Sequence, residues 1–319
     1  MLLMEWARTA FVFPGQGSQS VGMGRDLAEA YLLAKQTFEE ADSILGMSLS
    51  QLMFEGDEAT LGQTINTQPA LFVHSMALLR VLQSQHPQAT PAMLAGHSLG
   101  EITAITASGG LTFVDGLRLV QRRAALMQQA GEAAAGGMAA ILNLDKSTLQ
   151  AICEAVSAEI GQVVVIANDN CPGQIVISGA DAALSAAMER AKAAGAKRAL
   201  RLNVSTANHS PLMQSAESAF ADVVAETPFQ DGYIPVYANL TARRIQTAAE
   251  FRHELSHQLT RPVLWTDTIR QMIADGATTF VEVGNRDVLS GLIRRIDPNA
   301  AIYRISDVAT LQAFTAECH

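Results

Sequence analysis

A five-residue segment, G-H-S-L-G at residues 96–100, constrains the fold of this 319-residue chain more than any other feature. It follows a short apolar run at residues 93–95 and precedes a helix-forming stretch at residues 101–107. A serine in the G-x-S-x-G pattern lies on a sharp strand-to-helix turn, and the flanking glycines leave room for neighbouring backbone. The segment therefore predicts a strand, a tight turn and a helix, with the Ser98 hydroxyl near the helix N-terminus.

Alternating strand-like and helix-like patterns continue along the chain. The apolar run Thr9–Phe13 ends in the glycine-rich segment P-G-Q-G-S at residues 14–18, which predicts a strand followed by a loop. Apolar residues at three- and four-residue intervals predict the long helices. The expected strands are 9–13, 93–95, 138–144, 163–167, 174–178, 198–203, 234–237 and 279–283, and the expected helices are 25–45, 67–85, 111–131, 146–160, 180–194, 248–260, 264–275 and 287–295.

Between residues 137 and 202 the predicted order is β-α-β-β-α-β. This order is typical of a ferredoxin-like unit, in which two helices cover one face of an antiparallel sheet. On both sides of it the chain follows an α/β layer pattern. We therefore expect a small ferredoxin-like domain at residues 135–204, inserted into a large α/β domain formed by residues 1–134 and 205–319.

Composition and charge exclude several classes of protein. Hydrophobic residues make up 49% of the chain and charged residues 17%, which is an ordinary globular composition. The net charge of −9 gives no general attraction for nucleic acid or anionic membranes. No apolar stretch is long enough to cross a membrane, and no secretion signal is recognisable. Three cysteines without metal-ligand spacing (Cys153, Cys171 and Cys318) indicate reduced thiols, a cytoplasmic location and no metal site.

A serine nucleophile needs a base within hydrogen-bond reach, so the seven histidines must be compared. His74 lies within an apolar helical stretch, where a structural role is expected. His209 follows a predicted strand and precedes a proline-started helix, a position where loops at sheet ends often carry catalytic groups. His209 is thus the candidate base, and a structural loop histidine is the alternative.

Together with other segments, these residues resemble the malonyl-CoA:acyl carrier protein transacylases, which are acyltransferases of fatty-acid and polyketide synthesis. The resemblance covers nearly the whole chain. It implies an α/β-hydrolase-like large domain with the ferredoxin-like insertion. The segments that carry it, in the family's order, are Phe13–Gln19, Gln68–Ala70, Gly96–Glu101, Arg123, Asn168–Gly179, Asn208–Met213, Gln258–Val263 and Val281–Gly284.

The resemblance implies a Ser–His dyad. Ser98 is then the nucleophile, and His209 is its general base and acid, oriented by a main-chain carbonyl near Gln258. The backbone N–H groups of Gln16 and Leu99 form the oxyanion hole, which explains why a glycine-rich loop approaches the serine. A structural turn is the alternative role of that loop.

The resemblance also implies a substrate-binding set that includes Arg123, Gln258, Asn208 and His97. Arg123 is expected to bind the free carboxylate of the malonyl group, because a planar guanidinium makes two parallel bonds to a carboxylate. Its neighbour Arg122 points about 100° away on the same helix and is expected at the surface.

The expected activity is transfer of a malonyl group from malonyl-CoA to the phosphopantetheine thiol of an acyl carrier protein, through a malonyl-Ser98 intermediate. The CoA thioester is a substrate, and no cofactor is needed. The alternatives are an acyl-carrier-protein thioester hydrolase on the same fold, a malonyl transferase subunit of a polyketide synthase or malonate decarboxylase, and a non-catalytic scaffold.

Two positions depart from the family pattern. Asn208 precedes the histidine, where phenylalanine or serine is more usual beside the acyl α-carbon. The segment G-N-R-D at residues 284–287 stands where Gly-Pro-Gly is usual, in a loop near the mouth of the site. Because the carrier is acidic, docking needs a local basic surface, for which the pairs Arg294–Arg295 and Lys197–Arg198 are candidates.

Overall fold

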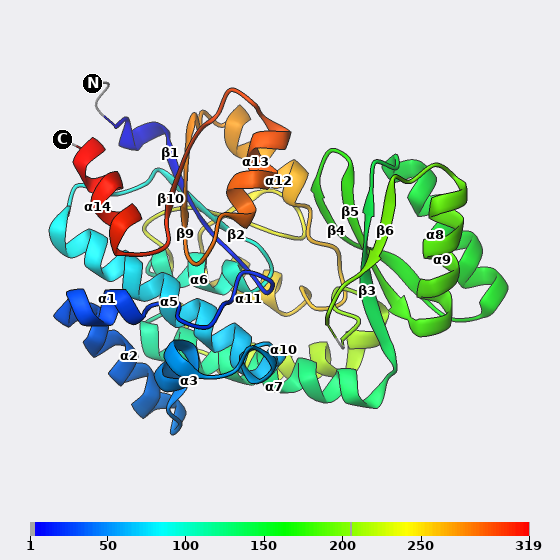
Figure 1. The fold of residues 1–319 in the computed structure, drawn as a ribbon, viewed down its shortest axis with the longest axis horizontal. Helices are drawn as coiled ribbons and strands as arrows, with labels where there is room; N and C mark the ends of the chain where they lie inside the picture. Colours follow the sequence, from blue (N-terminus) through cyan, green and yellow to red (C-terminus); the bar gives the residue numbers. More distant parts are fainter. Residues whose placement is uncertain (1–3, 205, 319) are drawn as a thin grey trace.

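Two β-sheets lie side by side and form the frame of the molecule (Figure 1). The computed structural model describes residues 4–204 and 206–318. Within these residues the larger sheet has six strands in the order β10-β9-β1-β2-β7-β8, and the smaller has four in the order β4-β5-β3-β6. The strands of the larger sheet are β1 (Thr9–Phe13), β2 (Met93–Gly96), β7 (Val236–Tyr237), β8 (Arg244–Ile245), β9 (Thr279–Val283) and β10 (Ala301–Ile305).

Strand β1 is in the middle of the larger sheet and pairs in parallel with β2 and β9. All five residues of β1 are buried, as expected for a parallel strand covered on both faces. The register places Phe13 of β1 beside Gly96 of β2. The glycine-rich loop after β1 and the serine turn after β2 therefore leave the same edge of the sheet next to each other.

Helices cover both faces of the larger sheet. Side chains of β1 alternate between two cores: Phe11 and Phe13 face one, and Ala10 and Val12 face the other. Helices α12 (Trp265–Ala274) and α13 (Val288–Ile296) cover the second face. The helices of this part of the chain are α1 (Arg25–Ala30), α2 (Leu32–Leu45), α3 (Leu49–Glu55), α4 (Glu58–Leu61), α5 (Thr64–Gln85), α6 (Leu99–Ala107), α7 (Phe113–Ala133), α10 (Gln214–Glu226), α11 (Ala248–Leu255), α12 (Trp265–Ala274), α13 (Val288–Ile296) and α14 (Val308–Glu317), with 3₁₀ turns at Trp6–Arg8 and Pro211–Met213.

The smaller sheet and its two helices form the predicted ferredoxin-like unit. The elements are β3 (Gly136–Leu142), α8 (Lys146–Ile160), β4 (Val164–Cys171), β5 (Gln174–Ala180), α9 (Asp181–Ala193) and β6 (Arg198–Arg201). Every strand pair in it is antiparallel. Helices α8 and α9 lie on the side turned away from the larger domain (Figure 1), so the opposite face of the sheet is left to line a site between the domains. The predicted fold class is confirmed.

The prediction was wrong or incomplete for several elements. The single helix expected over 25–45 is broken at Tyr31, whose φ of −129° and ψ of 118° are extended. The strand expected over 234–237 is only two residues long, Val236–Tyr237. Elements α3, α4, α14, β8 and β10 were not predicted. The two strands among them lie at the edges of the larger sheet and are only partly buried, so neither gives a clear pattern of burial. The expected boundary at residue 205 lies outside the described residues.

The close approach of the start of α6 to the end of β1 predicts a steric effect of Gly100→Ala. A Cβ at Gly100 would stand 2.1 Å from the carbonyl oxygen of Phe13, and backbone cannot move aside cheaply. We expect the free energy of unfolding, measured by urea denaturation, to fall by about 2–3 kcal/mol. The matched control is Gly291→Ala in α13, where a Cβ meets nothing within 4 Å. That change should stabilise by about 0.5–1 kcal/mol, and equal effects of the two variants would contradict the account.

Candidate active site

Ser98 lies on a strained turn between β2 and α6. Its φ of 53° and ψ of −105° are rarely adopted by residues other than glycine. Asn239 holds this conformation, because its Oδ1 accepts from the Ser98 N–H at 2.8 Å and its Nδ2 donates to the Gly96 carbonyl at 2.7 Å. A Cβ on Gly96 would stand 1.8 Å from the Gly100 carbonyl oxygen. The glycines predicted from the sequence are thus required by contact.

His209 is paired with Ser98. The distance from Ser98 Oγ to His209 Nε2 is 2.8 Å, and His209 Nδ1 is 3.0 Å from the carbonyl oxygens of both Gln258 and Arg261. Carbonyls only accept, so Nδ1 carries the hydrogen and Nε2 is free to accept from the serine hydroxyl. His209 also has a positive φ, 56°. The family resemblance implied the carbonyl near Gln258, whereas the contact with the Arg261 carbonyl was not expected.

The electrostatic surroundings keep His209 neutral. Burial, followed by the nearby Arg123 and His97, lowers the pKa of His209 from 6.5 to about 3. The imidazole is therefore neutral at every physiological pH and can accept a proton. Its low pKa makes it a weak base as long as no negative charge lies near it. Negative charge that develops close to the ring during a reaction would raise its pKa and help it to take a proton.

Arg123 extends from α7 and is buried against Ser98. Its Nη1 donates to Gln68 Oε1 at 2.8 Å, and its Nη2 donates to Gln258 Oε1 at 2.6 Å and to Ser98 Oγ at 3.0 Å. Its Nε has no hydrogen-bond partner. Burial lowers the pKa of Arg123 to about 10, so the group remains a cation at neutral pH. Its hydrogen-bond partners are all neutral, and a buried cation in such a setting favours an anionic ligand.

A pair of buried carboxyl groups lies beneath the dyad. Glu101 Oε1 accepts from the Asn239 N–H at 2.8 Å, and its Oε2 accepts from Gln258 Nε2. Burial and the neighbouring Glu254 raise the pKa of Glu101 well above its usual value, and burial raises that of Glu254. Glu101 thus positions both the residue that holds the serine turn and the residue that contacts Arg123. Sequence reasoning missed this role; its signal was a carboxyl group within the otherwise apolar helix at 99–107.

The predicted oxyanion-hole residues lie on the same cavity as Ser98. Leu99 is the first residue of α6, where backbone N–H groups have no intrahelical partner. Gln16 lies in a turn closed by the Ser18 N–H and the Gly15 carbonyl oxygen, 3.3 Å apart. A Cβ on Gly15 would stand 2.4 Å from the carbonyl oxygen of residue 97, so this loop packs directly on the serine turn. Their role as oxyanion donors stays a prediction.

The cavity, of about 160 Å³, lies between the large domain and the open face of the smaller sheet. Asn208 lines it, and the buried Oδ1 of Asn208 has no hydrogen-bond partner. His97 also lines it, with Nε2 2.9 Å from Asn170 Oδ1 on β4. Gln258 lies behind Arg123 and does not line the cavity. The other lining residues are Gly15, Ser18, Gln68, Arg123, Met127, Met138, Asn168, Asn170, Gln174, Val176, Leu202, Val204, His209, Val288, Leu289 and Leu292.

The basic pairs predicted for docking have different environments. Arg295 donates to Gln174 Oε1 at 2.8 Å and to the Pro172 carbonyl oxygen at 3.0 Å, so it ties α13 to the β4–β5 hairpin. Arg294 is exposed on the same helix. Lys197 and Arg198 are exposed where β6 begins, in the other domain.

The described part of the chain lacks two features that would point to other functions. Over residues 4–204 and 206–318, no helix combines the length and apolar character needed to cross a membrane. Over the same residues, no three His, Cys, Asp or Glu side chains are grouped so that they could hold a metal ion.

Comparison with known proteins gives matches over nearly the full length. A family model described as "Acyl transferase domain" matches residues 10–296. The chain is 42% identical over 306 residues to the malonyl CoA-acyl carrier protein transacylase of Bacillus subtilis, covering 96% of both chains. A crystal structure of an acyl carrier protein S-malonyltransferase from Vibrio cholerae matches with a TM-score of 0.92 at 42% identity, covering 96% of this chain and 99% of that one. A structure of a type II PKS acyl-carrier protein in complex with its malonyl-transacylase matches with a TM-score of 0.92 at 40% identity, covering 96% and 98%.

The low pKa of His209 predicts how Ser98 responds to pH. We expect a fluorophosphonate probe to label Ser98 at a rate that is nearly constant from pH 5.5 to 8, because His209 stays neutral well below this range. A histidine with an ordinary pKa near 6.5 would instead slow labelling about tenfold at pH 5.5. Labelling followed by intact-protein mass spectrometry decides between the two, with Ser98→Ala as the unlabelled control. A midpoint near pH 6.5 would contradict the account.

Proposed function

This chain belongs to the acyl transferase family, and we propose that it transfers a malonyl group from malonyl-CoA to the phosphopantetheine thiol of an acyl carrier protein. The names of its relatives support this assignment. The structural observation that carries it is the buried Arg123 guanidinium, whose Nη2 lies 3.0 Å from Ser98 Oγ. A nucleophile beside a buried cation is suited to an acyl group that bears its own carboxylate.

The first half of the proposed reaction loads the enzyme. Ser98 Oγ attacks the thioester carbonyl carbon while His209 Nε2 takes the hydroxyl proton. The carbonyl oxygen becomes an oxyanion, which the N–H groups of Gln16 and Leu99 stabilise. The carbon–sulfur bond then breaks, and His209 returns its proton to the departing CoA sulfur. The products are malonyl-Ser98 and free CoA.

The second half runs the same steps with a different thiol. The phosphopantetheine thiol of the carrier gives its proton to His209 Nε2, and its sulfur attacks the ester carbonyl of malonyl-Ser98. The bond to Ser98 Oγ breaks, and the serine regains its proton from the histidine. One dyad therefore serves both thiols, and no metal or bound cofactor takes part in the proposed reaction.

We propose that Arg123 selects the acyl group. Its two terminal nitrogens match the two oxygens of a carboxylate, so a malonyl group satisfies the guanidinium while an acetyl group leaves the buried charge without an anionic partner. This favours the transferase over a general thioester hydrolase, which gains nothing from a buried cation beside its acyl pocket. We place Asn208 beside the acyl α-carbon, because it precedes His209 and lines the same cavity.

The proposal also keeps the expected division of the chain into residues 1–134 with 205–319 and an insertion at 135–204. The sheet of that insertion runs from Gly136 to Arg201, which supports these limits. A cytoplasmic location is supported by the three cysteines, all of which are buried free thiols.

The proposed reaction is tested by intact-protein mass spectrometry after mixing with malonyl-CoA, followed by a chase with phosphopantetheinylated carrier protein. We expect a malonyl adduct that is absent from Ser98→Ala and that moves to the carrier. An adduct that decays to free malonate faster than it transfers would establish the hydrolase instead. If no CoA thioester gives an adduct, the non-catalytic scaffold would be the remaining alternative.

Replacing Arg123 should change the choice of acyl group. For Arg123→Ala we expect the rate of malonyl adduct formation to fall at least about 100-fold, because a charge-assisted bidentate pair is lost. The rate with acetyl-CoA should change much less, so the malonyl preference collapses. The matched control is Arg122→Ala, because this neighbour is exposed on the same helix. Equal losses with both donors would show that Arg123 acts only by supporting the dyad.

A further inference from the structure

The loop between β9 and α13 contacts the loop that carries Gln16. Asn285 Nδ2 donates to the carbonyl oxygen of Ser18 at 2.6 Å and to Ser20 Oγ at 2.8 Å. This is the position where the sequence departs from the usual Gly-Pro-Gly. Proline has no side-chain donor, so the usual pattern cannot make these two hydrogen bonds. Asn285 therefore adds a link between two loops that the family pattern does not supply.

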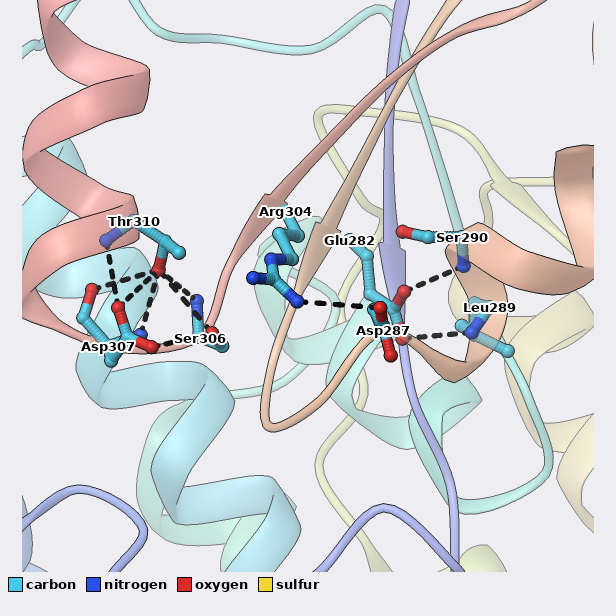
Figure 2. A network of polar contacts seen from close by, with 8 residues as sticks. All are labelled: Glu282, Asp287, Leu289, Ser290, Arg304, Ser306, Asp307 and Thr310. Atoms are coloured by element: carbon cyan, nitrogen blue, oxygen red, sulfur yellow. Dashed lines mark hydrogen bonds and ion pairs between the residues drawn. The ribbon is translucent and has the colours of Figure 1, made fainter.

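The loop that carries Asn285 is itself fixed at both ends, and Figure 2 shows the contacts that Glu282 and Asp287 make near it. At its start, the Gly284 N–H donates to the Ile305 carbonyl oxygen at 3.0 Å. At its end, the buried Glu282 carboxyl group accepts from two backbone N–H groups in the first turn of α13, those of Leu289 at 3.0 Å and Ser290 at 2.7 Å. Across the loop, Asp287 and Arg304 form an ion pair at 3.4 Å. Asn285 thus projects from a rigid support.

The hydrogen bond from Asn285 to the Ser18 carbonyl oxygen reaches the last residue of a tight turn. The turn runs from Gly15 to Ser18, and its two central residues are Gln16 and Gly17, the latter with a φ of 105°. Gly15 is held by its packing on the serine turn. Ser18 is 1% exposed, and its carbonyl oxygen is the atom that Asn285 binds. The Gln16 N–H belongs to the planar peptide that joins Gly15 to Gln16, so holding Gly15 on one side of the turn and Ser18 on the other restricts the directions that this N–H can take.

We propose that Asn285 is a positioning residue that holds the turn at 15–18, so that the Gln16 N–H points at the oxyanion formed on the Ser98 adduct. This inference rests on the proposed function, since it depends on Gln16 being an oxyanion donor. The oxyanion exists only in the transition state and the tetrahedral intermediate, so a well-aimed donor raises the rate of the chemical step and leaves substrate binding almost unchanged.

The test compares Asn285→Asp with wild type at pH 8. Aspartate has the same shape but, when ionised, offers no donor to the Ser18 carbonyl. Complete loss of one oxyanion donor costs about 10²–10³-fold, and a loosened donor costs less, so we expect acylation by saturating malonyl-CoA to slow about 10–50-fold. The half-saturating concentration should stay within about twofold, because ground-state contacts are unchanged. The matched control is Asn299→Asp, which makes the same charge change at an exposed turn before β10 and should behave as wild type.

A second readout separates this proposal from the function on which it rests. Phosphonylation of Ser98 by a fluorophosphonate also builds negative charge on an oxygen in the oxyanion hole, and it needs no natural substrate. We expect Asn285→Asp to slow labelling by a factor similar to that for acylation. If wild type accepts the probe but forms no malonyl adduct, the proposed function fails while the labelling rates still test Asn285.

Thermal unfolding and a second variant distinguish positioning from a merely structural role. Asn285→Ala removes the donor without adding charge, and it keeps the test open if the aspartate variant does not fold. We expect acylation and labelling to be slow in both variants even at temperatures well below the unfolding midpoint, where the variants are folded. Acylation and labelling rates within about twofold of wild type in a folded variant would overturn the proposal, and so would a loss seen only as weaker binding of malonyl-CoA.

Discussion

The buried cation beside the nucleophile sets the requirements for much of this structure. The terminal nitrogens of Arg123 donate to Gln68, Gln258 and Ser98, which come from three separate parts of the chain. None of these partners neutralises its charge. The same charge helps to keep the pKa of His209 low, so that the base stays unprotonated. A substrate carboxylate would supply the missing anion, which links acyl selection and proton transfer to one residue.

Backbone geometry brings the remaining parts of the site together. The parallel register of β1 and β2 places two loops at one edge of the sheet, and glycines at residues 15 and 100 allow them to touch. Asn239 and Glu101 then hold the strained serine turn through buried hydrogen bonds. Burial and the neighbouring Glu254 raise the pKa of Glu101, and the Glu101 carboxyl group in turn raises the pKa of Arg123 against the effect of burial. The carboxyl pair therefore supports the serine turn and helps to keep Arg123 charged.

Some of this was predictable from the sequence because it is local. The serine turn is encoded within five consecutive residues, and the ferredoxin-like order follows from alternating periodicities at 137–202. The rest depends on contacts between distant residues: Asn239 lies 141 positions from Ser98. The Arg261 carbonyl that helps to orient His209 is a backbone group, so no side-chain identity reveals it. The link made by Asn285 appeared in the sequence only as a departure from a family pattern, and its partners needed the three-dimensional arrangement.

The most direct test of the account is a crystal structure of the protein after reaction with malonyl-CoA. The account predicts malonyl-Ser98 with its carboxylate bound to two nitrogens of Arg123 at about 2.7–2.9 Å, and with Nη2 no longer on Ser98 Oγ. The ester carbonyl oxygen should face the N–H groups of Gln16 and Leu99. A carboxylate directed to solvent, with Arg123 bound only to Gln68, Gln258 and Ser98 as before, would contradict the central claim.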